Sequence, residues 1–343
     1  MCLHTNHQRP LVASRKIKVY KHVRYINNDS KVAITPFQAT CFTLNKEFVA
    51  QPDTVDIIKE SSGYALKGGV IHACLWPDFT KGSICLEAYI PEGVEYWIGI
   101  DKNTTCAKKI FVTDIEVTEK DFTGLDQEIA ESVYAEAPCK NGIRIGDVIK
   151  ENQQVKGVVI GFNGFKPLIA DFRHIVSADV DYKCNSTLHM HLRIEKAMHD
   201  MNGQGHMEAW EKVCKDNPAR FTAYHKVKAL GDSYYIPALG EMELLWKNLI
   251  YIAAGLSLAG FSCPFNMSGC YWTSTEYSLQ RNYSSTLDCN GAQRTIFYKY
   301  GIHQIIPFTV SVTGQKVVQA AKKKMSRLEW ITRRNGFLRR LLR

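Results

Sequence analysis

The segment Tyr271-Trp-Thr-Ser-Thr-Glu-Tyr-Ser278 opens a part of the chain that is built from short strand-like runs. Aromatic and β-branched residues, which favour strands, recur after it. Asn290-Gly291 is a residue pair typical of a two-residue hairpin turn. We therefore predict a series of short strands at 271–275, 283–287, 295–300 and 304–312.

The residues before this segment predict helices between two groups of strands. Pro237 stands at the start of 238–258, where apolar residues recur every three or four positions and indicate the strongest amphipathic helix of the chain. Asn163-Gly164 is a second hairpin signal. Further helical patterns cover 188–200, 209–214 and 221–230, and strands are predicted at 155–162 and 166–175. Helices enclosed between β-hairpins predict a mixed α+β domain.

The N-terminal third of the chain predicts a small strand-rich module. Its strand patterns lie at 16–25, 70–76, 83–90, 96–100 and 109–117. Residues 119–141 are more acidic and end near Pro138 and Gly142, which indicates a connecting helix or linker. We therefore expect a strand-rich N-terminal module at 1–118, a linker at 119–142, the α+β domain at 143–312 and a basic tail at 313–343.

The net positive charge belongs to the tail. The chain has 43 Lys and Arg and 34 Asp and Glu, and residues 313–343 hold ten of the basic residues but only Glu329 of the acidic ones. Residues 1–312 are therefore neutral and give no general argument for nucleic-acid binding. We expect this tail to be helical, with Met325, Leu328 and Ile331 on one face. Such a helix binds an acidic protein partner, nucleic acid or an anionic membrane surface; a solvated tail is the alternative.

Cysteine usage and the apolar segments bear on location. The 11 cysteines include no C-x-x-C pair, which is typical of buried thiols in a reducing compartment. Residues 1–7 have no apolar run and do not look like a signal peptide, so we expect a cytoplasmic protein or a virion component. The uncharged stretch 249–265 has only 17 residues, which is short for a transmembrane span and favours a buried helix.

Three segments of the chain stand in an order that is found in one family. They are Asp200-Met-Asn-Gly203, Asp232-Ser-Tyr-Tyr-Ile-Pro-Ala-Leu-Gly-Glu-Met-Glu-Leu-Leu245 and the segment 271–278, followed by Leu287-Asp-Cys-Asn-Gly291 and Ile305-Ile-Pro307. Together they resemble the C-type-lectin-like domains of gut Bacteroidetes and their phages. That type is similar to the C-terminal domain of the Legionella collagen-like adhesin and to the variable proteins of diversity-generating retroelements. The resemblance covers about residues 143–312. The N-terminal module resembles uncharacterised leader modules of gut-phage and Bacteroidales proteins, which implies no activity.

The resemblance implies a core motif and a ligand-binding face. The core motif is matched by Trp272, Glu276, Pro237 and Glu241, and the ligand-facing positions by Gln280, Arg281, Asn282, Tyr283, Gln293, Arg294, Tyr298 and Tyr300. Tyr, Ser, Thr, Asn and Gly fill 16 of the 30 positions 271–300, which suits an adaptable binding surface but also a half-exposed sheet. The chain departs from the family at 303–308, which lacks the usual arginine-bearing closing motif.

No group of residues in the sequence is typical of catalysis or metal binding. Glu241 and Glu243 are two positions apart on a helix, and Glu241 would interact with the helix dipole in the first turn. His189 and His191 have no further ligands at metal-site spacing. We therefore expect a non-enzymatic protein, without cofactor or metal, that binds a protein or glycan ligand.

Two settings fit such a protein. It is either a ligand-binding display protein, as a retroelement-diversified target or a phage surface protein, or a structural virion or assembly protein anchored by its N-terminal module or basic tail. A homo-oligomer is compatible with both, and neither requires a transmembrane segment.

Overall fold

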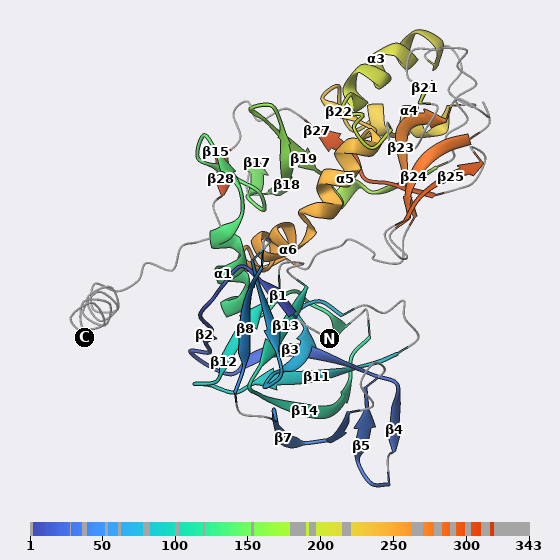
Figure 1. Ribbon diagram of the computed structural model, residues 1–343. Coiled ribbons are helices and arrows are strands. Elements are labelled where there is room, and N and C mark those ends of the chain that lie inside the picture. Colours follow the sequence, from blue (N-terminus) through green and yellow to red (C-terminus); the bar gives the residue numbers. More distant parts are fainter. Residues whose placement is uncertain are drawn as a thin grey trace.

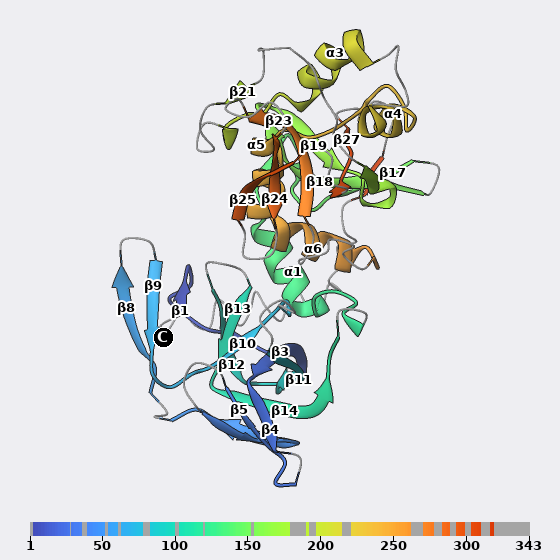
Figure 2. The ribbon, with the colours of Figure 1, turned by 90° about the vertical axis from the view of Figure 1, so that its right-hand side faces the viewer.

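The computed structural model describes residues 3–27, 29–35, 40–51, 54–60, 63–77, 83–99, 103–118, 121–151, 154–178, 190–191, 197–214, 221–261, 270–277, 283–288, 293–298, 303–309 and 316–318. The chain forms two strand-rich lobes that meet at two helices, α1 (Gln127–Glu136) and α6 (Leu249–Leu258) (Figures 1 and 2). Several antiparallel sheets and the helices of the C-terminal lobe make the fold mixed α+β, as the sequence predicts.

The main sheet of the N-terminal lobe curls back on itself. Its strands, in spatial order, are β2 (Leu11–Val12), β12 (Glu95–Ile98), β13 (Thr104–Ala107), β10 (Ile71–Cys74), β3 (Ile17–Val23), β11 (Ile84–Ile90), β14 (Lys109–Glu116) and β7 (Lys46–Val49). β13 and β14 are consecutive in the chain and join at Lys108. β13 pairs with β10, and β14 pairs with β11. β3 lies between β10 and β11 and pairs with both. The ring of strands therefore closes as a small barrel.

Two three-stranded sheets flank this barrel. One consists of β1 (Leu3–Thr5), β9 (Gly63–Lys67) and β8 (Asp56–Glu60), and the other of β4 (Tyr25–Asn27), β5 (Val32–Ile34) and β6 (Cys41–Thr43). The barrel strands alternate inward and outward positions, as the sequence of β3 predicts: Ile17, Val19 and Val23 are fully buried. Phe42 of β6 covers one part of the same core.

Helix α1 lies within what the sequence marks as a linker, and it is packed rather than exposed. Ile129, Ala130 and Val133 of α1 belong to the same apolar cluster as the barrel strands and as Ala253 and Ala254 of α6. Leu249, Ile252 and Leu256 of α6 belong to the core of the C-terminal lobe, so α6 packs in both cores at this interface.

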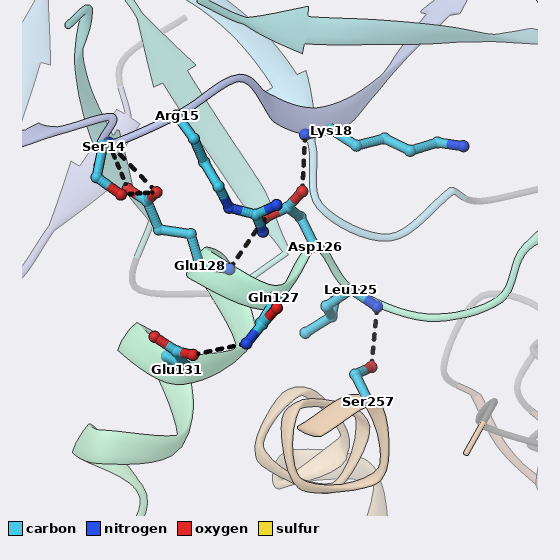
Figure 3. A network of polar contacts seen from close by, with 9 residues as sticks. All are labelled: Ser14, Arg15, Lys18, Leu125, Asp126, Gln127, Glu128, Glu131 and Ser257. Atoms are coloured by element: carbon cyan, nitrogen blue, oxygen red, sulfur yellow. Dashed lines mark hydrogen bonds and ion pairs between the residues drawn. The ribbon is translucent and has the colours of Figure 1, made fainter. Parts of the chain in front are cut away.

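The N-terminus of α1 is held by polar contacts from both lobes (Figure 3). Asp126 is the N-cap and accepts a hydrogen bond from the Glu128 amide, while its carboxylate also accepts from Arg15 Nη2 at 2.7 Å. The carboxylate of Glu128 accepts from the Ser14 amide at 3.0 Å. On the other side, the Leu125 amide donates to Ser257 Oγ of α6 at 3.0 Å.

These contacts give a first prediction. Replacing Asp126→Ala removes the N-cap and the Arg15 ion pair, and we expect the free energy of unfolding to fall by about 2 kcal/mol. Urea denaturation measures this loss. The control Glu131→Ala removes only an exposed contact with Gln127, and we expect a change below about 0.5 kcal/mol. Equal losses in both variants would contradict the role of Asp126.

The C-terminal lobe contains two six-stranded sheets and a short ribbon. The first sheet has the order β22 (Tyr234–Tyr235), β27 (Phe308–Thr309), β19 (Lys166–Ala170), β18 (Gln154–Asn163), β17 (Val148–Glu151) and β28 (Lys316–Val318). The second has the order β20 (Val176–Ala178), β26 (His303–Ile305), β23 (Cys270–Tyr277), β24 (Tyr283–Asp288) and β25 (Gln293–Tyr298), with β21 (Met190–His191) also on β23. The ribbon pairs β15 (Cys139–Lys140) with β16 (Ile143–Arg144).

The longest predicted helix of this lobe is broken in the structure. The helices of the lobe are α3 (Gly203–Cys214), α4 (Thr222–Lys228), α5 (Leu239–Lys247) and α6, with a 3-10 turn, η3 (Phe172–His174). The single helix predicted at 238–258 is wrong, because the chain breaks at Asn248 into α5 and α6. The Asn248 side-chain amide donates to Ile160 O of β18 at 2.9 Å, which fixes the break against the sheet.

Three further predictions are corrected by the strands. The helix predicted at 188–200 is wrong at Met190–His191, because these residues form β21 parallel to β23. The strand predicted at 304–312 is two strands, β26 and β27, separated at Ile306 and Pro307, where a proline cannot donate to a ladder. The tail does not begin as a helix, because Lys316–Val318 forms β28 beside β17, and residues 319–343 lie outside the described residues.

The uncharged stretch at 249–265 forms the short helix α6, whose residues Ile252, Ala253 and Ala254 are fully buried. Within the part of the chain that the structure describes, no helix has the length and apolar character needed to span a membrane. The expectation of a buried helix is therefore confirmed for 249–258.

Candidate ligand-binding hairpin and the polar network beneath it

Strands β24 and β25 form a hairpin at one end of the second sheet of the C-terminal lobe (Figure 2). β24 pairs with β23 on its other side, and β25 is the last strand in the sheet order. Tyr283 lies directly opposite Tyr298, and Leu287 lies opposite Arg294. Positions that face each other across an antiparallel pair share one face of the sheet.

The structure places half of the predicted ligand-facing residues. Tyr283, Arg294 and Tyr298 occupy positions on one face of the hairpin, because 294 and 298 are four residues apart and Tyr283 pairs with Tyr298. Gln293 pairs with Asp288 and occupies the alternate face. The other predicted positions, Gln280, Arg281, Asn282 and Tyr300, lie outside the described residues.

Strand β23, which carries the hairpin, is buried along its first half. Tyr271, Trp272, Thr273, Ser274 and Thr275 are all fully buried. The Trp272 ring packs edge-on against the His303 ring, with centroids 4.9 Å apart. The Glu276 backbone pairs with Ser284 of β24 and with Met190 of β21. Trp272 therefore belongs to the core, and this strand is a fixed support for the hairpin.

A network of buried polar side chains holds β23 against α3 and α5. Ser274 Oγ and His206 Nδ1 of α3 are hydrogen-bonded at 2.7 Å. His206 Nε2 lies 3.5 Å from Asp200 Oδ2. Thr275 Oγ1 donates to the same Asp200 oxygen at 2.7 Å and accepts from the Leu239 amide of α5 at 2.9 Å. Asp200, His206, Ser274, Thr275 and Glu241 are hereafter the buried polar network.

The order Ser274, His206, Asp200 has the hydrogen-bond sequence of a nucleophile, a base and its orienting acid. Ser274 is nevertheless fully buried and His206 is 1% exposed, so a substrate has no path to the hydroxyl in this structure. The Ser274 amide is also bonded to Pro237 O at 2.8 Å, so it cannot stabilise an oxyanion. The geometry therefore favours a structural role, in which each buried polar atom has a partner.

Glu241 completes the network at the start of α5. Its carboxylate accepts from the Ala238 amide at 2.8 Å and from Tyr235 Oη at 3.1 Å, which is the capping interaction expected from its place in the first turn. Burial raises the Glu241 pKa to about 7, and the nearby Asp200 adds to this against the opposing effect of the donated hydrogen bonds. A Cβ on Gly203 would lie 2.5 Å from Glu241 Oε2, so this contact needs a glycine.

The raised pKa of Glu241 predicts a pH dependence. The folded-state pKa of Glu241 lies above the ordinary value of 4.5, so the folded protein binds more protons than the unfolded chain between pH 4.5 and about 7. The contribution of Glu241 to the free energy of unfolding is therefore fully present below pH 4.5 and is lost as pH rises to about 7. For a shift from 4.5 to about 7, the loss amounts to about 3 kcal/mol. In Glu241→Gln this loss is absent, because the amide does not titrate and its nitrogen can donate to Tyr235 Oη.

Urea denaturation at pH 5 and pH 7 measures this difference. We expect wild type to lose more stability over this interval than Glu241→Gln does. Glu211→Gln, an exposed position on α3, is the matched control and should follow wild type. Parallel pH profiles for wild type and Glu241→Gln would contradict the assignment.

A second buried carboxylate lies at the other side of the same core. Asp171 is fully buried and accepts from Arg173 Nη2 at 3.0 Å and from Tyr234 Oη at 3.0 Å, with His174 Nδ1 at 2.8 Å. Burial opposes ionisation of Asp171, but the hydrogen bonds from Arg173 and His174 hold its pKa below the ordinary value. This group ties η3 to β22 and is a structural ion pair.

Sequence reasoning did not find the buried polar network. The helical pattern at 188–200 ends at Asp200, no pattern singles out His206, and Ser274 lies 68 residues from His206 in the chain. No local spacing links such residues, so only the family resemblance, which places all three segments in one domain, carried a signal. Among the described residues, no three His, Cys, Asp or Glu side chains gather as a metal site.

The sequence matches no protein-family model, no curated protein and no solved structure.

Proposed function

We propose that this protein is a ligand-binding display protein, in which residues 143–312 adopt a C-type-lectin-like fold and the β24–β25 hairpin binds a protein or glycan. The main support is that the three motif segments meet in the buried polar network. Asp200 and Gly203 belong to the first segment, Glu241 to the second, and Ser274 and Thr275 to the third. Motifs that are far apart in sequence thus converge on β23, the strand that pairs with the hairpin.

This arrangement suits binding for a physical reason. A ligand-binding surface gains affinity when its backbone is ordered before the ligand arrives. Here β24 pairs with β23, and β23 is fixed to two helices through Ser274 and Thr275. The Tyr283 and Tyr298 positions, directly opposite each other, offer large contact area at low conformational cost.

An array of glycans and host-surface proteins tests the proposal. We expect the full-length chain to bind at least one array component, and the double variant Tyr283→Ala with Tyr298→Ala to lose that signal. Phe165→Ala is the matched control, because Phe165 is 78% exposed in the same lobe but lies at the β18–β19 turn. An unchanged signal in the double variant, with its melting temperature retained, would place binding elsewhere.

A second candidate is a structural virion or assembly protein anchored through its basic tail or N-terminal module. One observation favours a tail anchored to the body: Val317 pairs with Ile149, so β28 joins the edge of a sheet. Deleting residues 319–343 leaves β28 in place. Loss of incorporation into a particle, with ligand binding retained, supports this candidate, whereas full incorporation of the deleted protein contradicts it.

A further inference from the structure

A groove opens on the N-terminal barrel where two strands diverge. β12 pairs with β13, and β7 pairs with β14, on the same side of the continuous segment that β13 and β14 form. Both strands meet at Lys108. Its amide donates to Glu95 O of β12, and its carbonyl accepts from the amide of Ala50, which follows β7. Beyond this point the two strands separate and leave a groove of about 490 Å³. The groove lies in the opposite lobe from the β24–β25 hairpin (Figure 1).

The wall of this groove is apolar, with ion pairs at its rim. Val12, Val49 and Val94 line it, and Val12 and Val49 are 58% and 45% exposed. Lys108 and Lys109 also line it, but each is already paired with a carboxylate. Lys108 Nζ lies 2.7 Å from Glu95 Oε2, and Lys109 Nζ lies 3.0 Å from Glu47 Oε2.

Next to the groove is a row of half-exposed residues with two aromatic rings. Tyr89 of β11 pairs with Phe111 of β14, and Phe111 pairs with Glu47 of β7. The Lys16 ammonium lies 3.5 Å from the centre of the Tyr89 ring. Lys18, at the end of the row, is paired with Glu87. The Lys16 ammonium covers the Tyr89 ring and lies 6.0 Å from the centre of the Phe111 ring, so the surface beside the groove carries charges that are mostly balanced.

We propose that this groove binds an uncharged oligosaccharide. A sugar hydroxyl both donates and accepts hydrogen bonds, whereas an ammonium only donates and a carboxylate only accepts. A Lys–Glu pair at the rim of a groove presents both functions side by side. Exposed ion pairs contribute little to stability, so their hydrogen bonds are available to a ligand at low cost. The valines that line the groove match the apolar CH faces of a sugar.

The charge balance argues against a polyanion. Nucleic acid binding requires basic side chains that neutralise phosphates and release counterions. Of the four lysines on this surface, Lys18, Lys108 and Lys109 are paired with carboxylates, and the fourth, Lys16, lies over a ring. The surface therefore has little net charge to attract phosphate groups.

The experiment uses the full-length chain and isothermal titration calorimetry with maltohexaose, cellohexaose, xylohexaose, mannohexaose and chitohexaose. A single-stranded oligonucleotide, dT12, is the polyanion probe. We expect at least one hexasaccharide to bind, with an affinity that changes less than twofold between 50 and 300 mM salt. Val49→Arg fills the groove and should weaken this binding at least tenfold. Val49 is half exposed, so this variant should fold.

Two controls separate this groove from other sites. Ile115→Arg adds the same charge at an exposed position of β14 outside the groove, and should bind like wild type. The hairpin double variant Tyr283→Ala with Tyr298→Ala should also bind the hexasaccharide, so failure of the hairpin proposal leaves this result unaffected. Absence of binding to all five hexasaccharides, equal binding by Val49→Arg, or dT12 binding that Val49→Arg abolishes would each overturn the proposal.

Discussion

The variant Gly255→Ala should be strongly destabilised, although glycine to alanine inside a helix is ordinarily stabilising by about 1 kcal/mol. Gly255 lies in the middle of α6, at the meeting point of the two lobes. A Cβ at this position would lie 1.9 Å from Gly146 O, which is a backbone atom. The contact is reciprocal, because a Cβ on Gly146 would lie 2.3 Å from Tyr251 O of the same helix.

Backbone atoms cannot move aside as a flexible side chain can, so α6 must move away from the backbone at Gly146 in this variant. We expect the free energy of unfolding to fall by about 3 kcal/mol or more. Thermal or urea denaturation measures the change. Gly164→Ala is the control: it has positive φ but open space around its Cβ, and should cost about 1 kcal/mol. A stabilised Gly255→Ala protein would contradict the close packing of α6.

The variant Lys21→Met should be more stable than wild type at neutral pH. Lys21 points into the barrel core, where it is 9% exposed. Its ammonium donates to the His72 carbonyl and lies 5.0 Å from the centre of the Phe42 ring. Burial lowers the Lys21 pKa to about 8, so the protein must bury a charge to fold at pH 7. Methionine fills a similar volume without this cost, and we expect a gain of about 2 kcal/mol.

The sign of the pH dependence provides a second readout. The folded-state pKa of Lys21 lies below its ordinary value of 10.5, so the unfolded chain binds more protons between about pH 8 and 10.5. The wild-type protein should therefore gain stability relative to Lys21→Met as pH rises through this interval, by up to about 3 kcal/mol. Lys59→Met, on the exposed strand β8, is the control. A destabilised Lys21→Met protein with a parallel pH profile would contradict the buried charge.

Local patterns in the sequence predicted the elements whose structure depends on local residues. The alternation in Ile17–Val23 gave β3, and Asn163-Gly164 gave the turn between β18 and β19. The break between α5 and α6 could not be predicted in this way, because Asn248 is fixed by Ile160, which is 88 residues away. Met190–His191 has a helical pattern but forms a strand, because its backbone pairs with β23.

The same distinction applies to the candidate site. The hairpin and its tyrosines are visible in the sequence, because strand patterns and the turn pair Asn290-Gly291 are local signals. The buried polar network is not visible, because Asp200, His206 and Ser274 come from separate segments. Helix α1 shows the same limit: the sequence indicated a connecting helix or linker, but not that Ile129 and Val133 of this helix pack in the barrel core.

Hydrogen–deuterium exchange on the full-length chain tests the hairpin proposal, with and without the strongest array component whose signal the double variant Tyr283→Ala with Tyr298→Ala loses. We expect this ligand to slow exchange in peptides covering residues 270–300 and to leave peptides covering the barrel strands β3, β11 and β14 unchanged. Protection confined to the N-terminal barrel, with the hairpin peptides exchanging as in the free protein, would contradict the claim that the β24–β25 hairpin binds the ligand.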